Sequence, residues 1–181
     1  MPLSIPGFML TLCRVIIGLL FLYSFLGKIT DISSFQKAIR NFQIVPPVLI
    51  KPFSYLLVFA EITIVGLMAL GREFLLPGFG LAAFLLLIFA IAIGSVLRRR
   101  ISTSCNCFGP SEKTLTFFDI IRNAIFILIA FSGVRILIVQ GLSYFAINIT
   151  DVVLAGIMAV CVILILTHLS EIFRVFLPGA E

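Results

Sequence analysis

Long apolar runs alternate with short polar connectors along this chain. Five runs are each long enough to cross the roughly 30 Å hydrocarbon layer of a bilayer: 8–27, 53–71, 75–97, 117–138 and 150–168. Backbone groups in lipid must find hydrogen-bond partners within their own segment, so each run is predicted to be an α-helix. The pattern predicts an all-α, polytopic integral membrane helical bundle that forms one transmembrane domain over residues 1–181.

The longest connector, residues 28–52, has a helical pattern of its own. Its apolar residues recur at spacings of four and three: Phe35, Ile39 and Phe42. Cationic residues lie between them, and this arrangement is typical of an amphipathic helix in the plane of the membrane interface. We therefore expect an interfacial helix within about 31–44, and we expect the prolines at 46 and 47 to end it.

The composition agrees with a chain that is solvated by lipid. Hydrophobic residues make up 61% of the 181 positions and charged residues 12%, and the mean hydropathy is +1.26. A soluble domain is about half apolar and about a quarter charged, so this chain is too apolar to cover itself with a polar surface. The bilayer is the expected partner, and nucleic acid is not, because the net charge of +5 is spread between the apolar runs.

The distribution of cations predicts an orientation in the membrane. If every run crosses, the first connector, the third connector and the C-terminal tail share one face. Most of the cations fall on that face: Lys28, Lys37, Arg40, Lys51, Arg98, Arg99, Arg100, Lys113 and Arg174. Because lysine and arginine accumulate in cytoplasmic loops, the charge pattern places this face in the cytoplasm.

Cys105 and Cys107 form the main candidate for chemistry. Their thiols are close enough to bridge, but the small ring is strained, and a strained disulfide belongs to the labile or catalytic class. A turn signal, Gly109-Pro110, follows. A half-site for zinc is the rival interpretation, but it needs two more ligands, and His168 alone does not complete it, so no metal is expected. Two incidental thiols are the remaining alternative.

Ionisable residues also fall inside the apolar runs, where they are costly and often mark function. Glu61 lies at mid-membrane depth, and a long side chain from Arg14 or Arg122 could reach it. Asp119, Arg122 and Asn123 share one face of the run 117–138, just after the cysteine pair. We expect Arg122 to stabilise a thiolate there.

Each of these residues also has a structural interpretation. Asp119 could be a helix cap, and Glu61 with an arginine could be an ion pair that holds the bundle together. Lys28, at the end of the first run, is expected to extend its ammonium toward the interface.

Taken together, these residues resemble the DoxX superfamily, and specifically its methylamine-utilisation MauE branch. The resemblance covers about residues 10–135 and is carried by Arg14, Gly18, Phe21, Gly27-Lys28, Phe35, Pro46, Glu61, Gly66, Gly71, Cys105-x-Cys107-Phe108-Gly109 and Arg122-Asn123. It implies a four-helix core over 10–140, to which the run 150–168 adds a fifth C-terminal span.

The resemblance also implies thiol or sulfur redox chemistry in the inner membrane. The MauE branch is associated with maturation of a disulfide-rich periplasmic enzyme subunit. The arrangement is similar to that of vitamin K epoxide reductases, which implies a quinone as electron acceptor and a thioredoxin-like partner. Unlike those reductases, this chain has a C-x-C pair and lacks a second pair in its first connector.

The sequence thus leads to two hypotheses. The first is a membrane thiol–disulfide oxidoreductase, in which Cys105 and Cys107 react, Arg122 assists, and Glu61, Arg14 and Asn123 form a polar cluster for a cofactor. The second is a membrane scaffold or maturation factor whose cysteine loop docks a partner or a metal. The resemblance implies a periplasmic cysteine pair and the charge pattern a cytoplasmic one, so both sides stay open.

Overall fold

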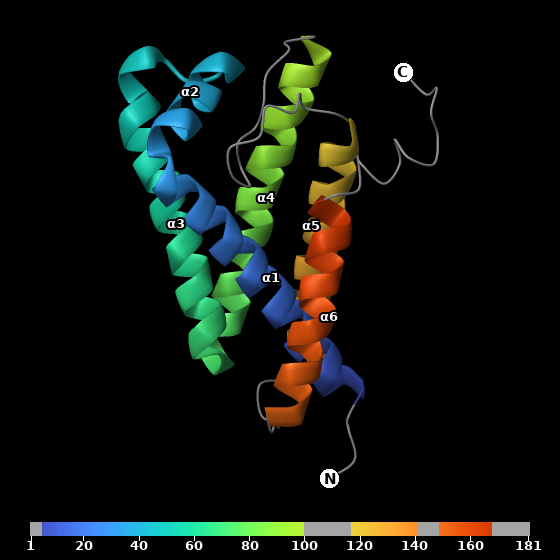
Figure 1. Ribbon diagram of the computed structural model, residues 1–181. Helices are drawn as coiled ribbons and strands as arrows, with labels where there is room; N and C mark the ends of the chain where they lie inside the picture. The colour runs from blue at the N-terminus through green and yellow to red at the C-terminus, as the bar shows by residue number, and fades with distance from the viewer. Residues whose placement is uncertain (1–4, 100–116, 141–148, 168–181) are drawn as a thin grey trace.

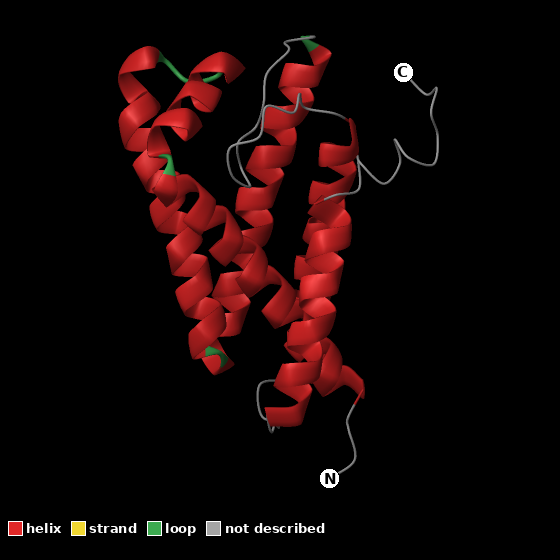
Figure 2. Cartoon of the chain, viewed as in Figure 1, coloured by secondary structure: helices red, strands yellow, loops and turns green. Residues whose placement is uncertain are grey.

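The computed structural model describes residues 5–99, 117–140 and 149–167 of the chain. Its helical elements are α1 (Ile5–Thr30), α2 (Ile32–Phe42), the 3₁₀ turn η1 (Pro47–Leu49), α3 (Ile50–Leu70), the 3₁₀ turn η2 (Arg72–Phe74), α4 (Leu75–Arg98), α5 (Phe117–Gln140) and α6 (Ile149–Thr167). Five segments are long and apolar enough to cross a membrane, and they coincide with the five predicted runs. The predicted polytopic helical bundle is confirmed, and within the described ranges every regular element is a helix (Figure 2).

Helix α1 is the centre of the bundle. It crosses diagonally between the other long helices (Figure 1) and contacts each of the other five α-helices. Helices α3 and α4 follow one another in opposite directions, and α4 packs closely against α5. The end of α1, all of α2, the start of α3, the end of α4 and the start of α5 lie at one end of the bundle, which we call the α2 end.

Helix α2 confirms the predicted amphipathic helix. The Asp31 carboxylate caps its first turn by accepting a hydrogen bond from the Ser34 backbone N–H at 3.0 Å, and its apolar face buries Phe35 and Ile39. The expected stop at the two prolines is wrong, because the helix already ends at Phe42. Gln43 adopts a left-handed conformation with φ 53°, and its N–H bonds back into the last turn.

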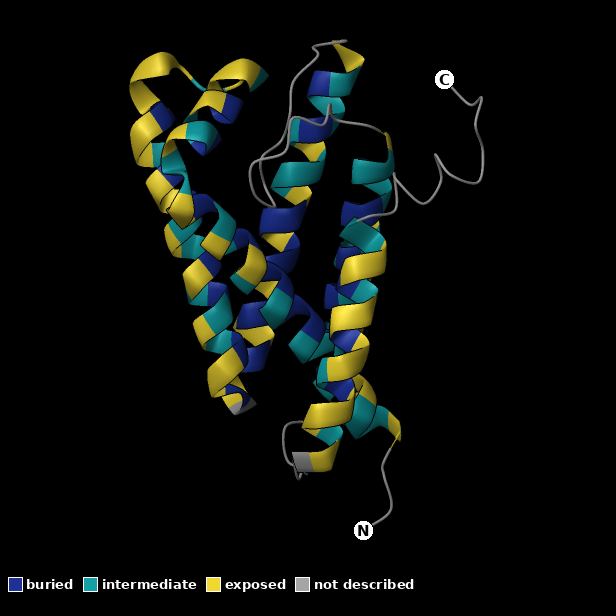
Figure 3. Cartoon of the chain, viewed as in Figure 1, coloured by how far each residue is buried: buried dark blue, intermediate teal, exposed yellow. Residues whose placement is uncertain are grey.

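The distribution of apolar side chains agrees with a bilayer as solvent. Large apolar residues are buried where the helices meet and exposed over the outer surfaces of α3 and α6 (Figure 3). Small residues permit close helix contacts in the interior, among them Ala82, Ala130 and Ala159, which are completely buried. An apolar outer surface of this extent is stable in lipid but would be a liability in water.

Candidate functional site

A buried ion pair joins α1 to α3. Lys28 lies in the last turn of α1 and Glu61 near the middle of α3, and neither is exposed at all. The Lys28 ammonium contacts Glu61 Oε1 directly. It also donates a hydrogen bond to Ser24 Oγ at 3.0 Å, and the Ser24 hydroxyl donates to Glu61 Oε1 at 3.0 Å. The three side chains form a closed triangle in which each supports the other two.

Two phenylalanines shield this pair. The Lys28 nitrogen lies 4.9 Å from the ring centroid of Phe35, which belongs to α2, and 4.7 Å from that of Phe89, which belongs to α4. Both rings are within the range of a cation–π interaction, which is worth roughly 2 kcal/mol or more when the cation is desolvated. The ammonium therefore lies between one carboxylate and two aromatic faces, which shield it from solvent and favour its charged form.

Glu61 also lines a small cavity whose wall is mostly apolar. Ser24 lines this cavity too, and Arg122 and Asn123 of α5 complete its polar part. Its free volume is about 20 Å³, enough for about one water molecule. Glu61 Oε2 accepts no hydrogen bond from any residue within the described ranges. A buried oxygen of this kind is a natural acceptor for a water or for a polar group of a ligand.

Helix α5 brings further charge to the same region. The Arg122 guanidinium lies 3.2 Å from Asp119 Oδ1, one turn earlier on α5. Arg122 and Asn123 are both buried. The predicted polar face of this helix is therefore confirmed, and it points toward the buried ion pair. Lys28 of α1 contacts Glu61 directly, and Arg122 of α5 lines the same cavity as Glu61.

Arg14 lies elsewhere, so the expectation that it pairs with Glu61 is wrong. Its Nε donates a hydrogen bond to the Met68 carbonyl and its Nη2 to the Ala69 carbonyl at 2.9 Å. These carbonyls belong to the last turn of α3, at the opposite end of the bundle from α2. An α-helix leaves its last carbonyls without intrahelical partners, and Arg14 satisfies two of them.

Cys105 and Cys107 lie outside the described residues, as does His168. The segment that carries the two cysteines connects Arg99, at the end of α4, with Phe117, at the start of α5. Cys13, partly buried in α1, and Cys161, exposed on α6, are free thiols within apolar helices. Among the described residues no group of histidine, cysteine and carboxylate side chains is arranged to hold a metal.

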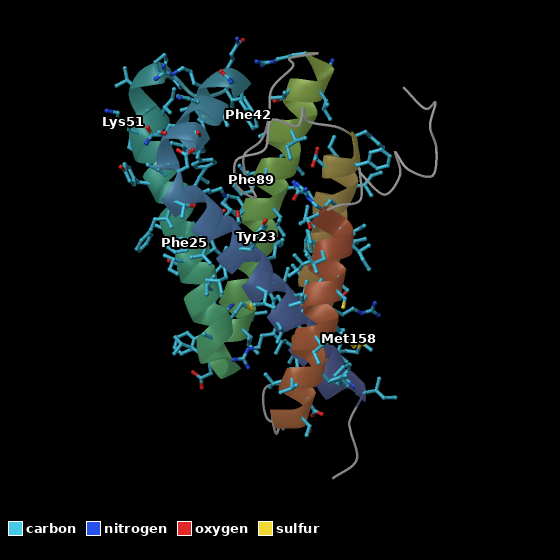
Figure 4. The ribbon with its side chains drawn as sticks, viewed as in Figure 1. Tyr23, Phe25, Phe42, Lys51, Phe89 and Met158 are labelled. Atoms are coloured by element: carbon cyan, nitrogen blue, oxygen red, sulfur yellow. The ribbon has the colours of Figure 1, made fainter. Side chains whose placement is uncertain are left out.

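An apolar pocket lies beside the ion pair, between α2, α3 and α4. Its free volume is about 200 Å³, and its walls include four phenylalanines: Phe35, Phe42, Phe53 and Phe89. Phe42 and Phe89 lie one above the other between α2 and α4 in Figure 4. Phe35 and Phe89 separate the pocket from the Lys28 ammonium. The pocket suits an apolar ring or chain, since its described lining offers no hydrogen-bonding side chain.

Asp31 lies outside the membrane-spanning segments, and the hydrogen bonds by which it caps α2 change its pKa. Hydrogen bonds from the Ser34 hydroxyl, the Ser34 backbone N–H and the Ser33 hydroxyl lower the pKa of Asp31 to about 2. The charged carboxylate thus stabilises the first turn of α2, the helix that places Phe35 over Lys28.

Two site residues were not predicted from the sequence. Lys28 was expected to reach the interface, yet it is completely buried, because α1 continues to Thr30 and α2 folds over it. Ser24 was not singled out at all. Its position four residues before Lys28 was the available signal, because residues four apart share one face of a helix.

Comparison with known proteins gives two matches. The model of the family described as methylamine utilisation protein MauE matches residues 6–136. The methylamine utilization protein MauE of Paracoccus denitrificans is 30% identical over 115 residues, which cover 62% of this chain and 61% of that protein. This chain thus aligns with less than two thirds of its relative's length. No solved structure matches.

Proposed function

Because this chain belongs to the family of methylamine utilisation protein MauE, we propose that it is a membrane thiol–disulfide redox protein that serves methylamine utilisation in the inner membrane. The proposal includes membership of the wider DoxX superfamily. The observation that carries it is the buried polar site of Lys28, Glu61, Arg122 and Asn123, at the level where α5 begins after the cysteine pair. Charged groups buried inside a membrane bundle are costly and often mark a functional site, such as a proton relay.

The proposed reaction is thiol–disulfide exchange. A thiolate of a partner's dithiol attacks the disulfide of Cys105 and Cys107, the S–S bond breaks, and a mixed disulfide forms. The partner's second thiolate then displaces the reduced pair. Two electrons pass from the partner to the two cysteines, which gain two protons as the partner's thiols lose two. The partner is a thioredoxin-like or sulfur-containing protein.

The chain's own residues assist this exchange. Arg122, which lies in the second turn of α5, stabilises by its positive charge the thiolate of whichever cysteine of this chain is displaced when the disulfide opens. Glu61 Oε2 and Asn123 offer hydrogen-bonding groups on one cavity, where they hold a water that moves protons. The pocket between α2, α3 and α4 holds the apolar part of a membrane acceptor. A quinone bound there supplies a two-electron, two-proton acceptor that restores the disulfide.

The first test is a redox titration of the full chain in detergent. In a Cys13→Ser, Cys161→Ser background only Cys105 and Cys107 can react with a maleimide that shifts the electrophoretic mobility. As the ratio of reduced to oxidised glutathione changes, we expect both thiols to lose and regain their reactivity with maleimide together and reversibly. A membrane-impermeant maleimide applied to intact cells then reports the side on which the pair lies.

The second test follows turnover with dithiothreitol as donor and a short-chain ubiquinone as acceptor. Serine at Cys105 or Cys107 should abolish turnover, and one of the two variants should accumulate a mixed disulfide with the partner. Arg122→Leu should slow exchange near neutral pH, whereas Arg122→Lys should preserve most of it, because the charge remains. A double serine variant that retains full turnover, or thiols that bind a metal, would favour the scaffold hypothesis instead.

A further inference from the structure

A third cavity lies in the surface between α1, α3 and α6. Its free volume is about 340 Å³. Apolar side chains form most of its wall, including Leu19 and Leu22 of α1, Val65 of α3 and Val152 of α6. Val152 is 38% exposed, and the other three are partly exposed, so this groove is open to the surrounding lipid. A hydrocarbon chain is the ligand that such walls accommodate.

Arg14 forms the polar end of this groove. A guanidinium has five N–H donors, and the bonds to the Met68 and Ala69 carbonyls use two. Three donors therefore have no acceptor among the residues that the structure describes. None of the described carboxylates forms an ion pair with Arg14 either. The groove thus combines an apolar wall with one cation whose charge is not balanced within the described ranges.

Arg14 lies beside the end of the span formed by α3, whose last turn it contacts. Its guanidinium packs against Gly71, the residue that ends α3, and the polar pair Arg72-Glu73 follows. A span that ends here places its last turn close to the lipid phosphates. Arginine binds phosphate through paired N–H groups, and the donors of Arg14 remain available for such a contact.

We infer that the groove between α1, α3 and α6 binds an anionic phospholipid, with its phosphate on Arg14 and one acyl chain along the apolar wall. Helix α6 lies beyond residues 6–136, the part that matches the family model. Because Val152 of α6 closes the groove, a bound lipid fastens this helix to the α1–α3 pair. The inference concerns the opposite end of the bundle from the proposed redox site and does not depend on it.

The experiment compares two membranes. The full chain is placed in nanodiscs of phosphatidylcholine alone or of phosphatidylcholine with phosphatidylglycerol, and its Tm is measured. A ligand that binds only the folded state raises Tm, and we expect about 2–4 °C more in the membrane that contains phosphatidylglycerol. Native mass spectrometry of the protein released from each membrane should show phosphatidylglycerol retained in preference to phosphatidylcholine.

Matched variants test the two halves of the site. Arg14→Gln should remove the phosphatidylglycerol-dependent rise, whereas Arg14→Lys should keep most of it. Arg135→Gln removes an exposed cation near the same end of the bundle and should leave the rise unchanged. Val65→Phe fills the groove without touching Arg14 and should reduce the rise, while Ile62→Phe, on the lipid-facing side of α3, should not.

Several outcomes would overturn the inference. One is an equal Tm in both membranes, and another is a rise in Tm that persists in Arg14→Gln. A third is a rise that Arg135→Gln removes equally, because the effect would then come from surface charge in general. Retention of a free fatty acid in place of a phospholipid would assign the groove to a different ligand. If Arg14→Gln does not fold, because it also caps α3, the Val65 and Ile62 pair decides the question alone.

Discussion

Removing the charge of Glu61 should destabilise the protein strongly. In Glu61→Gln the buried Lys28 ammonium loses its carboxylate and keeps only Ser24 and two aromatic faces. Removing one partner of a buried ion pair costs about 3–5 kcal/mol, because the other charge is left without compensation. For a chain of this size each kcal/mol lowers Tm by about 2–4 °C, so a loss of about 6–20 °C is expected.

The measurement is thermal unfolding of the detergent-purified protein, followed by far-UV circular dichroism, because the chain has no tryptophan for intrinsic fluorescence. Glu73→Gln is the matched control, since Glu73 is exposed in η2 and the same change there should leave Tm nearly constant. The double variant Lys28→Met, Glu61→Gln removes both charges together. It should regain much of the lost stability, because a buried pair replaced by neutral groups is often tolerated.

The double variant also decides whether the pair or the single residues matter. If Lys28 and Glu61 interact as the structure shows, the two single losses should sum to more than the loss of the double variant. A Glu61→Gln protein that melts like the unchanged chain would refute the reasoning. So would single losses that simply add, because they would mean that the two charges do not depend on one another.

Two further predictions concern backbone features. Gly71→Ala should lower the free energy of unfolding by about 1–3 kcal/mol, because φ is 69° there and the new Cβ would lie 2.9 Å from Arg14 Nη1. Gly66→Ala, within α3, is the control, because its Cβ would meet nothing within 4 Å and should not destabilise the protein. Equal melting of the two variants would contradict this. Asp31 stabilises α2 while ionised, so its contribution should be complete above its ordinary pKa of 3.8 and should be lost as the pH falls toward about 2. Hydrogen exchange in α2 should show this loss, and Asp31→Asn, which still caps, should remove the pH dependence.

The spans were predictable from the sequence for a simple reason. In lipid the length of an apolar run decides whether a helix can cross, and neighbouring helices change little of that. The amphipathic pattern of α2 was equally local, because Phe35 and Ile39 needed only a helix to reach one face. The exact end of α2 was not, since the left-handed turn at Gln43 competes with the prolines that follow.

The pairing of charges could not be read in the same way. Three cations, Arg14, Lys28 and Arg122, could each reach a buried carboxylate by side-chain length alone. Which of them meets Glu61 depends on how steeply α1 crosses α3, and the sequence carries no direct signal for that angle. Lysines at the end of an apolar run usually extend to the interface. Lys28 does not, because α2 turns back and covers it with Phe35.

The two cations of α1 act on the same neighbour from opposite ends. Arg14 and Lys28 are fourteen residues apart, about 21 Å along a helix, and nearly four whole turns bring them to similar faces. Arg14 holds the last turn of α3, and Lys28 holds its middle at Glu61. Two fixed points on one pair of antiparallel helices determine both their register and their crossing. Lys28 and Glu61 therefore fix the helices around the candidate site as well as contributing polar groups to it, and Arg14 fixes the opposite end of the same helix pair.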